Sequence, residues 1–152
     1  MGEDFHGSHL IYTAMGGPGC FSNVGRVGET GQKVNLGSPE CLNIGHILHE
    51  TLHGLGLSIF SKITQLIFSG AVHEQSRPDR DFYISILMEN VVPASRKNFR
   101  KESGDTHSGR GTPFDPQSIM IYGPTDFGIV IEDSMGERQT TIQPLDPEVE
   151  IR

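Results

Sequence analysis

The sequence has no tryptophan and only two cysteines among its 152 residues, and aromatic residues make up 7% of it. A hydrophobic core would therefore rest mostly on Ile, Leu, Val, Met and Phe. Basic residues are also scarce, because 12 Lys and Arg stand against 19 Asp and Glu and give a formal net charge of −7. A phosphate-binding surface needs the opposite charge, so this balance argues against nucleic acid as a partner.

Long hydrophobic runs are absent as well. No stretch approaches the roughly 20 apolar residues that span a bilayer, and the most apolar one, residues 57–70, carries Lys62 in its middle. The first ten residues have no apolar segment of the kind that a signal peptide requires. We therefore expect no membrane span and no signal peptide or propeptide in this chain. That leaves a cytosolic protein, or a secreted one whose leader lies outside the chain.

The length suits one domain. Nineteen Gly and nine Pro, 28 of 152 residues or about 18%, indicate a loop-rich globular domain and fall short of the level typical of disorder. A strand is expected at residues 9–15, closed by a glycine-rich turn at 16–19, and a weaker strand at Gln32–Leu36. Further on, we expect a short helix at 84–91 and an ordered loop at 113–124.

Residues 41–56 are predicted to form a helix. Side chains that can line an apolar stripe recur there at steps of three and four residues: Ile44, Ile47, Leu48, Thr51, Leu52 and Leu55. Gly54 and Gly56 are expected to end the helix, because glycine is common just past the last helical turn.

This helix carries the sequence His49-Glu50-Thr51-Leu52-His53, an HExxH motif. Side chains four residues apart lie one above the other on a helix, so both imidazoles face the same way. Two neutral ring nitrogens at about 2.0–2.1 Å from one ion suit tetrahedral zinc. Glu50 emerges beside them, where it can take a proton from a zinc-activated water. The motif therefore predicts His49 and His53 as zinc ligands and Glu50 as general base.

A longer pattern contains this motif. Gly56 lies three residues after His53, and residues 73–81 read HEQSRPDRD. Together they resemble the elongated zinc signature of the astacin family of metzincin peptidases, HExxHxxGxxHExxRxDRD. The resemblance implies that His73 is the third ligand of one zinc ion per chain. It extends over most of the chain, from about Ser8 to Arg152.

A second block is similar to the same family. Residues 118–123, SIMIYG, resemble its Met-turn, SxMHYG. By this resemblance Met120 forms an apolar floor beneath the metal. Tyr122 would reach the metal from the side at rest and then swing to stabilise the oxyanion of the reaction. Ile121 stands where the family has a histidine that is not a zinc ligand, so we expect only a local change.

The two cysteines fit the resemblance too. Cys20 and Cys41 precede the zinc-binding helix, as do the cysteines of the family's short disulfide. An isolated pair of cysteines is equally compatible with free thiols in a cytosolic protein. Beside the zinc signature, a disulfide and an oxidising compartment become the favoured interpretation, and the chain is expected to be secreted.

The sequence departs from its family at one place. Two residues separate the glycine from the third histidine in the family pattern, whereas sixteen separate Gly56 from His73, and removing residues 57–70 restores the pattern. Fourteen codons keep the reading frame, and residues 68–70 can be encoded by a pyrimidine-rich run ending in AG. These features suggest a retained intron or a gene-model error, with a genuine surface loop as the alternative. A helix continued through the insert would carry His73 away from the metal, whereas a helix ending at Gly56 would let it return.

These features predict an α+β, zincin-like metallopeptidase domain over residues 1–152, with the zinc-binding helix under a small mixed sheet. The resemblance implies more structure before residue 8 and a helix after Arg152, so the domain is expected to be incomplete at both ends, its N-terminal lobe above all. The implied activity is zinc-dependent hydrolysis of protein or peptide substrates, bound extended along residues 9–15. The alternative is a non-catalytic fragment or pseudo-peptidase with impaired zinc binding.

Other polar residues receive structural interpretations. Glu74 is an alternative third ligand, 21 residues after His53, but the Met-turn and the HEQSRPDRD run argue against it. His46 is expected to be a polar residue near a helix start, and three further histidines have no ligand partners at useful spacing: His6, His9 and His107. A structural cluster of hydrogen bonds and ion pairs is expected from Arg77, Asp79, Arg80 and Asp81.

Overall fold

A computed structural model covers the chain and describes residues 7–27, 31–55, 73–102, 112–132 and 134–152. The chain divides into two compact units, Met1–Ala71 and Val72–Arg152. Each unit is described by itself below. The predicted insert at 57–70 lies outside the described residues, as do His6 and His107.

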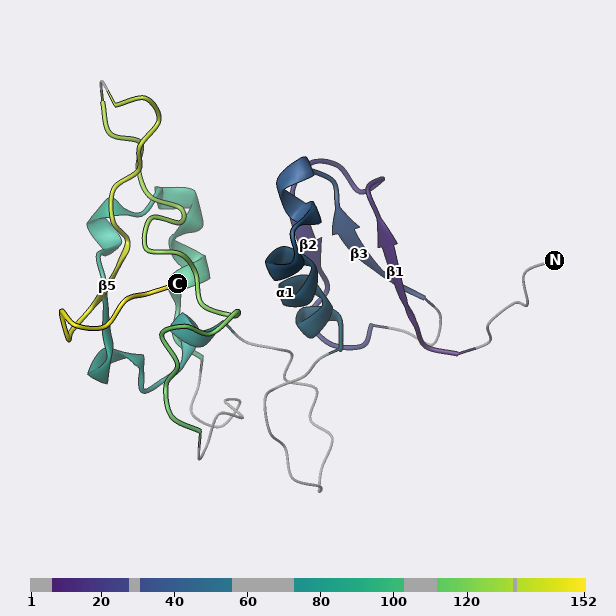
Figure 1. The fold of residues 1–152 in the computed structure, drawn as a ribbon, viewed down its shortest axis with the longest axis horizontal. Helices are drawn as coiled ribbons and strands as arrows, with labels where there is room; N and C mark the ends of the chain where they lie inside the picture. The colour runs from purple at the N-terminus through teal and green to yellow at the C-terminus, as the bar shows by residue number, and fades with distance from the viewer. Residues whose placement is uncertain (1–6, 28–30, 56–72, 103–111, 133) are drawn as a thin grey trace. The chain divides into compact units, whose positions relative to one another are not determined.

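A three-stranded sheet forms the first unit together with one helix (Figure 1). Its strands are β1 (Leu10–Thr13), β2 (Cys20–Ser22) and β3 (Gln32–Leu36), in the order β1-β3-β2. β1 runs parallel to β3, and β2 runs antiparallel to it. The sheet is therefore small and mixed, as predicted, although β1 is shorter than the expected strand at 9–15.

The glycine-rich turn between β1 and β2 forms around Asn35 of β3. The Asn35 amide nitrogen donates to the carbonyl oxygens of Gly17 and Gly19 at 2.9 and 2.8 Å, and its oxygen accepts from the Gly16 N–H at 2.9 Å. Gly17 and Gly19 have φ angles of 95° and 101°, which favour glycine. The predicted turn at 16–19 is confirmed, and the buried Asn35 side chain makes three hydrogen bonds to its backbone.

The helix α1 spans Ile44–Leu55 and follows a separate 3-10 helix at Pro39–Leu42. The predicted start at residue 41 was wrong, because Asn43 between them is extended, with φ −83° and ψ 153°. The Asn43 side-chain oxygen accepts the backbone N–H of His46 at 3.0 Å, which caps the first turn of α1.

Only part of the predicted apolar stripe on α1 faces the sheet, where the Thr51 hydroxyl lies 2.8 Å from the Tyr12 hydroxyl of β1. Ile44 and Leu48 of that stripe are 72% and 46% exposed, whereas the buried residues of α1 are Glu50, His53 and Gly54. A Cβ on Gly54 would lie 3.0 Å from a Leu10 methyl group and 3.1 Å from the Ser22 hydroxyl. Gly54 was expected to end the helix; it lies inside the helix, where the absence of a side chain lets α1 approach the sheet.

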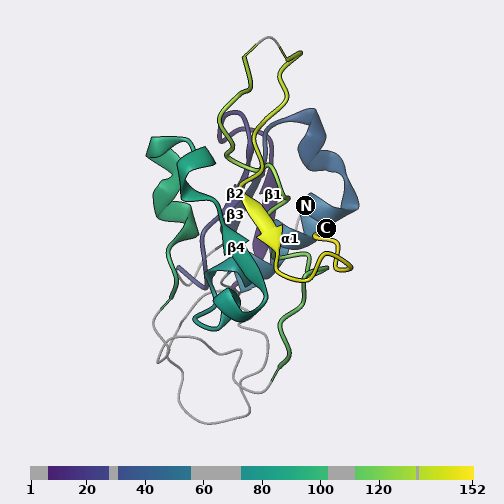
Figure 2. The same cartoon turned by 90° about the vertical axis from the view of Figure 1, so that its left-hand side faces the viewer.

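The second unit contains a two-stranded antiparallel sheet of β4 (Ile84–Ile86) and β5 (Ile142–Pro144) (Figure 2). Short 3-10 helices make up most of its other regular structure: Glu74–Ser76, Arg80–Phe82, Met88–Asn90 and Pro93–Phe99. Its core consists of Ile84, Val91, Phe99, Phe114, Ile121 and Ile142.

Two sequence predictions fall in this unit. The helix expected at 84–91 was wrong. Ile84 and Ile86 pair with β5, and only Met88–Asn90 forms a short 3-10 helix. The ordered loop expected at 113–124 is confirmed, since these residues form turns without a helix or strand. Ile121, the departure from the Met-turn pattern, is 7% exposed and packs in the core.

Candidate metal centre

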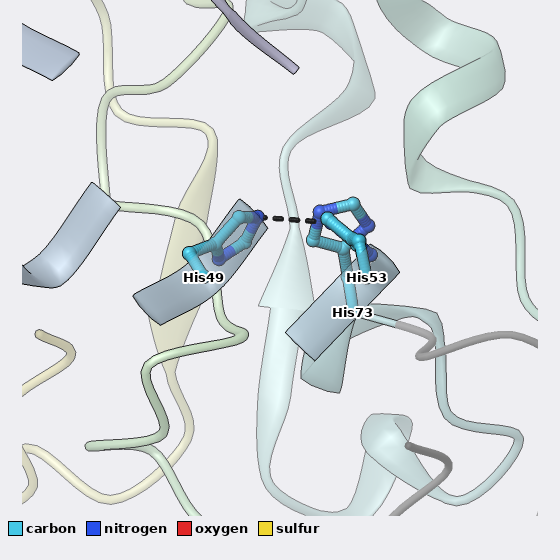
Figure 3. Close-up of side chains that lie close together, drawn as sticks. All are labelled: His49, His53 and His73. Atoms are coloured by element: carbon cyan, nitrogen blue, oxygen red, sulfur yellow. Dashed lines mark hydrogen bonds between the residues drawn. The ribbon is translucent and has the colours of Figure 1, made fainter. Parts of the chain in front are cut away.

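His49 and His53 lie on successive turns of α1, and their side chains point toward each other (Figure 3). Their Nε2 atoms are 3.0 Å apart, and the two rings meet edge to face at 86°. The helical spacing of four residues alone places both imidazoles on one side of α1. His53 is buried and His49 half-buried, so the pair lies at the edge of the packed interior.

This pair fits a zinc ion. Two nitrogens bound to tetrahedral zinc at about 2.0–2.1 Å would be separated by about 3.3 Å, close to the observed 3.0 Å. Neutral imidazole nitrogens are also among the ligands that zinc prefers. His49 and His53 are therefore candidate metal ligands within the first unit.

Glu50 lies between the two histidines in sequence and is 6% exposed. Its burial raises the pKa of the carboxyl group to about 7, and this effect outweighs the opposing influence of His46 and of a hydrogen bond from the Ser22 backbone. The Oε2 atom of Glu50 has no hydrogen-bond partner among the described residues. A carboxylate with such a pKa can accept and release a proton near neutral pH.

Backbone contacts fix the C-terminal end of α1 against the sheet. The Gly25 N–H donates to the His53 carbonyl oxygen at 2.8 Å, and the Gln32 side-chain amide donates to the Gly54 carbonyl oxygen at 3.2 Å. The last carbonyl groups of a helix have no partners within it. Here the loop at Gly25 and the strand β3 supply the hydrogen-bond donors for these carbonyl groups. These contacts hold His53 in place.

His73 and Tyr122 lie together in the second unit. Their ring centroids are 4.4 Å apart, and the Tyr122 ring also packs against Phe99 and Phe127. His73 directly precedes the 3-10 helix Glu74–Ser76. Met120 is 2% exposed, so its side chain is enclosed.

Residues 74 and 75 attach this segment to the Met-turn. The Glu74 N–H donates to the Met120 carbonyl oxygen at 2.9 Å, and the Gln75 side-chain oxygen accepts from the Tyr122 N–H at 3.1 Å. The Glu74 carboxylate also accepts from Arg77 and from the Asp115 N–H, each at 3.0 Å. These hydrogen bonds hold the Glu74 side chain within the second unit, which disfavours the alternative that it is a metal ligand.

The arginine–aspartate segment after Ser76 is structural, as predicted. Arg77 binds both carboxylate oxygens of Asp79 at 2.9 and 2.8 Å. Arg80 donates to two buried carbonyl oxygens and to Asp81, and a hydrogen bond from Lys101 lowers the pKa of Asp81. His46 lies exposed near the start of α1 and contacts the neighbouring Asn43 side chain, which agrees with its predicted role.

Cys20 and Cys41 form a disulfide that joins β2 to the 3-10 helix Pro39–Leu42. Their Cα atoms are 5.5 Å apart, within the usual range for a disulfide. Cys41 is fully buried. The bond crosslinks the segment just before α1 to the strand whose Ser22 contacts Glu50.

The family model for the astacin peptidases matches residues 2–150. The chain belongs to the astacin family. It is 41% identical over 118 residues to zinc metalloproteinase dpy-31 of Caenorhabditis elegans, covering 76% of this chain and 17% of that protein. It is 33% identical over 151 residues to protein SpAN of Strongylocentrotus purpuratus, covering 97% of this chain and 21% of that protein.

A solved structure is similar as well. High choriolytic enzyme 1, a hatching enzyme zinc-protease from Oryzias latipes, matches with a TM-score of 0.70 and 32% identity, over 99% of this chain and 62% of that chain. The predicted α+β, zincin-like fold is thereby confirmed. The chain spans about a fifth of the two curated relatives above.

Two contacts of this site were not predicted. Ser22 touches Glu50 through its backbone, so no residue type could signal it. Gln75 lies inside the HEQSRPDRD run at a position that the family pattern leaves open, and only its buried contact with Tyr122 shows its place. Among the described residues, no helix is long and apolar enough to cross a membrane.

Proposed function

We propose that this chain is part of a zinc metalloendopeptidase in which His49, His53 and His73 hold one zinc ion. The 3.0 Å separation of the His49 and His53 Nε2 atoms carries this proposal, because it matches what two ligands of one zinc ion require. The family supports His73 as third ligand, and the hydrogen bonds that the Glu74 carboxylate already accepts disfavour Glu74 in that role. Zinc, when bound, would polarise a carbonyl oxygen of the substrate and lower the pKa of a bound water to about 7.

Glu50 is the general base in this proposal. Its carboxylate takes a proton from the attacking water and passes it to the nitrogen of the leaving amine as the peptide bond breaks. In the metal-free chain burial raises its pKa to about 7, so the carboxyl group can both take up and release a proton near neutral pH. The Ser22 N–H steadies one side of the carboxyl group, and the partnerless Oε2 can face the water.

Tyr122 stabilises the charge that develops on the substrate carbonyl oxygen. A phenol O–H donates to this oxyanion and costs little reorganisation if the ring is already held near it. Contacts with His73 and with the rings of Phe99 and Phe127 support such a position. Met120, whose side chain is enclosed, would supply the apolar floor beneath the metal.

In this proposal the substrate adds a strand to the sheet along β2, as an alternative to residues 9–15, the strand first expected. Within the described residues β1 and β2 each pair on one side only, with β3. Ser22 in β2 contacts Glu50, so a peptide on the unpaired edge of β2 runs past the general base. Backbone hydrogen bonds of this kind bind extended peptides without demanding a particular sequence.

The protein is secreted in this proposal. The Cys20–Cys41 disulfide supports an oxidising compartment, because such bonds are rare in the cytosol. The competing proposal is a non-catalytic fragment or pseudo-peptidase. One observation favours it: sixteen residues separate Gly56 from His73, where the family pattern has two.

Replacing Glu50 tests the proposed activity. Glu50→Gln should keep the zinc content of the full chain, because Glu50 is not a ligand, and should lower turnover of an unfolded protein substrate by about 10²- to 10⁴-fold. Glu40→Gln, the same change at an exposed position before α1, is the matched control and should cleave normally. Turnover of Glu50→Gln within a few-fold of the original chain would refute the role of Glu50. A zinc-loaded original chain without activity would favour the pseudo-peptidase.

A further inference from the structure

Gln75 connects the segment that carries His73 to the Met-turn that carries Tyr122. It is fully buried in the 3-10 helix Glu74–Ser76, and its side-chain oxygen accepts the Tyr122 N–H at 3.1 Å. The neighbouring Glu74 N–H donates to the Met120 carbonyl oxygen at 2.9 Å. Two consecutive residues therefore contact two positions of the Met-turn, one through backbone and one through side chain.

This pair of contacts sets the register between His73 and Tyr122. His73 directly precedes Glu74, so any slip of residues 74–75 along the Met-turn would move His73 relative to the Tyr122 ring. The two ring centroids are 4.4 Å apart. The Gln75 backbone is itself fixed, because Arg80 donates to its carbonyl oxygen at 2.6 Å. Gln75 thus links a rigid backbone to the amide group of Tyr122.

Stability does not explain a glutamine at this position. The Nε2 atom of Gln75 is buried and has no hydrogen-bond partner among the described residues. Leaving a buried donor unsatisfied costs at least as much free energy as one neutral hydrogen bond returns. An apolar side chain of similar length would fill the same space without this cost. Within the described residues, the benefit of the Gln75 side chain therefore comes from the hydrogen bond that its oxygen accepts from Tyr122.

We propose that Gln75 is a positioning residue that holds Tyr122 for its work on the substrate oxyanion. This inference deepens the proposed peptidase function and rests on it for the role of Tyr122. Gln75 touches neither substrate nor metal in this account. It acts through the Tyr122 backbone, and the side-chain oxygen must be the acceptor because an amide nitrogen cannot accept from an N–H.

The test replaces Gln75 with methionine, which has a similar length and no acceptor of comparable strength. Hydrogen exchange of the Tyr122 amide in the metal-free full chain is the primary readout. Gln75→Met should speed this exchange by about ten-fold or more. The Leu87 amide, which donates to Thr141 in the same unit, should keep its rate. Gln75→Glu retains an acceptor and should restore most of the protection of Tyr122.

A purely structural role predicts a different pattern. Global destabilisation of the unit would speed exchange at Leu87 as well as at Tyr122. Ile84→Val is the matched control: it removes a methylene group from the core of the same unit and lowers stability without removing the hydrogen bond between Gln75 and Tyr122. It should leave the ratio of the Tyr122 and Leu87 exchange rates unchanged.

Kinetics give the second readout. Gln75→Met should lower kcat by roughly 10- to 100-fold, the scale of a small misplacement of a catalytic group, with KM nearly unchanged. In a Tyr122→Phe background the same change should cost almost nothing more.

Exchange alone decides whether Gln75 holds Tyr122, even in a chain that cleaves nothing. An unchanged Tyr122 amide in Gln75→Met, or equal acceleration at Leu87, would overturn the inference. Absence of peptidase activity in the original chain would instead count against the proposed function. Equal kinetic losses with and without the Tyr122 hydroxyl would also overturn the positioning role.

Discussion

Burial of the Glu50 side chain has a cost in stability that depends on pH. Its pKa is about 7 in the folded chain and about 4.5 in a solvated glutamate. Below pH 4.5 both states hold the proton, so burial costs nothing through ionisation. Between these values only the unfolded state releases the proton, and folding stability falls as the pH rises. Above pH 7 both states are ionised and the full cost remains.

Glu50→Gln should therefore stabilise the metal-free chain at pH 8 and have little such effect at pH 4.5. The reason is that glutamine stays neutral at every pH, whereas the buried carboxylate must be charged above pH 7. Thermal unfolding midpoints of both chains, measured in a chelator at several pH values, test this. A difference between the two midpoints that does not change with pH would contradict the raised pKa.

At the scale of single residues, the sequence predicted the site residues but not the residues that hydrogen-bond to them. The HExxH spacing was enough to place His49 and His53 together, because helix geometry relates residues four apart. Ser22 and Gln75 were missed. Their contacts with Glu50 and Tyr122 depend on long-range packing, which no local spacing encodes.

The helix α1 is positioned by the smallest side chain on its buried face. Gly54 lies where a Cβ would come within 3.0 Å of Leu10 and 3.1 Å of Ser22. Its carbonyl oxygen also accepts from Gln32 at 3.2 Å. The approach of α1 to the sheet, and with it the contact between β2 and Glu50, depends on this glycine.

Gly54→Val should lower the stability of the chain by about 1–3 kcal/mol, because the added methyl groups overpack the contact between α1 and the sheet. Ile44→Ala, a change on the same helix at a side chain that is 72% exposed, should cost much less. Urea unfolding of both variants in the metal-free chain measures the difference. Equal stability of Gly54→Val and the original chain would show that α1 can move away from the sheet freely.

Elements were predicted well where local signals agree. The turn at 16–19 and β3 at Gln32–Leu36 matched, and glycines with positive φ mark the turn. The helix expected at 84–91 failed, since pairing with β5 outweighs the local pattern. The stripe on α1 was right only in part, because the helix also turns two site residues, Glu50 and His53, toward the interior.

At the scale of the whole molecule, the proposed ligands come from distant parts of the chain. His49 and His53 belong to the first compact unit, and His73 to the second. The insert at 57–70 lies between them in sequence and outside the described residues. That it weakens zinc binding, as a retained intron would, stays a prediction. Family membership followed from the motifs alone, because the two parts of the astacin signature flank this insert and the Met-turn follows them.

The central claim is that three histidines hold one zinc ion. The most direct test is the zinc content of the purified full chain, measured by elemental analysis after dialysis against buffer without chelator. We expect one zinc per chain in the original protein and in Glu74→Gln, and a strongly reduced content in His73→Ala, which loses a ligand. One zinc per chain in His73→Ala, or its loss in a folded Glu74→Gln, would contradict the account.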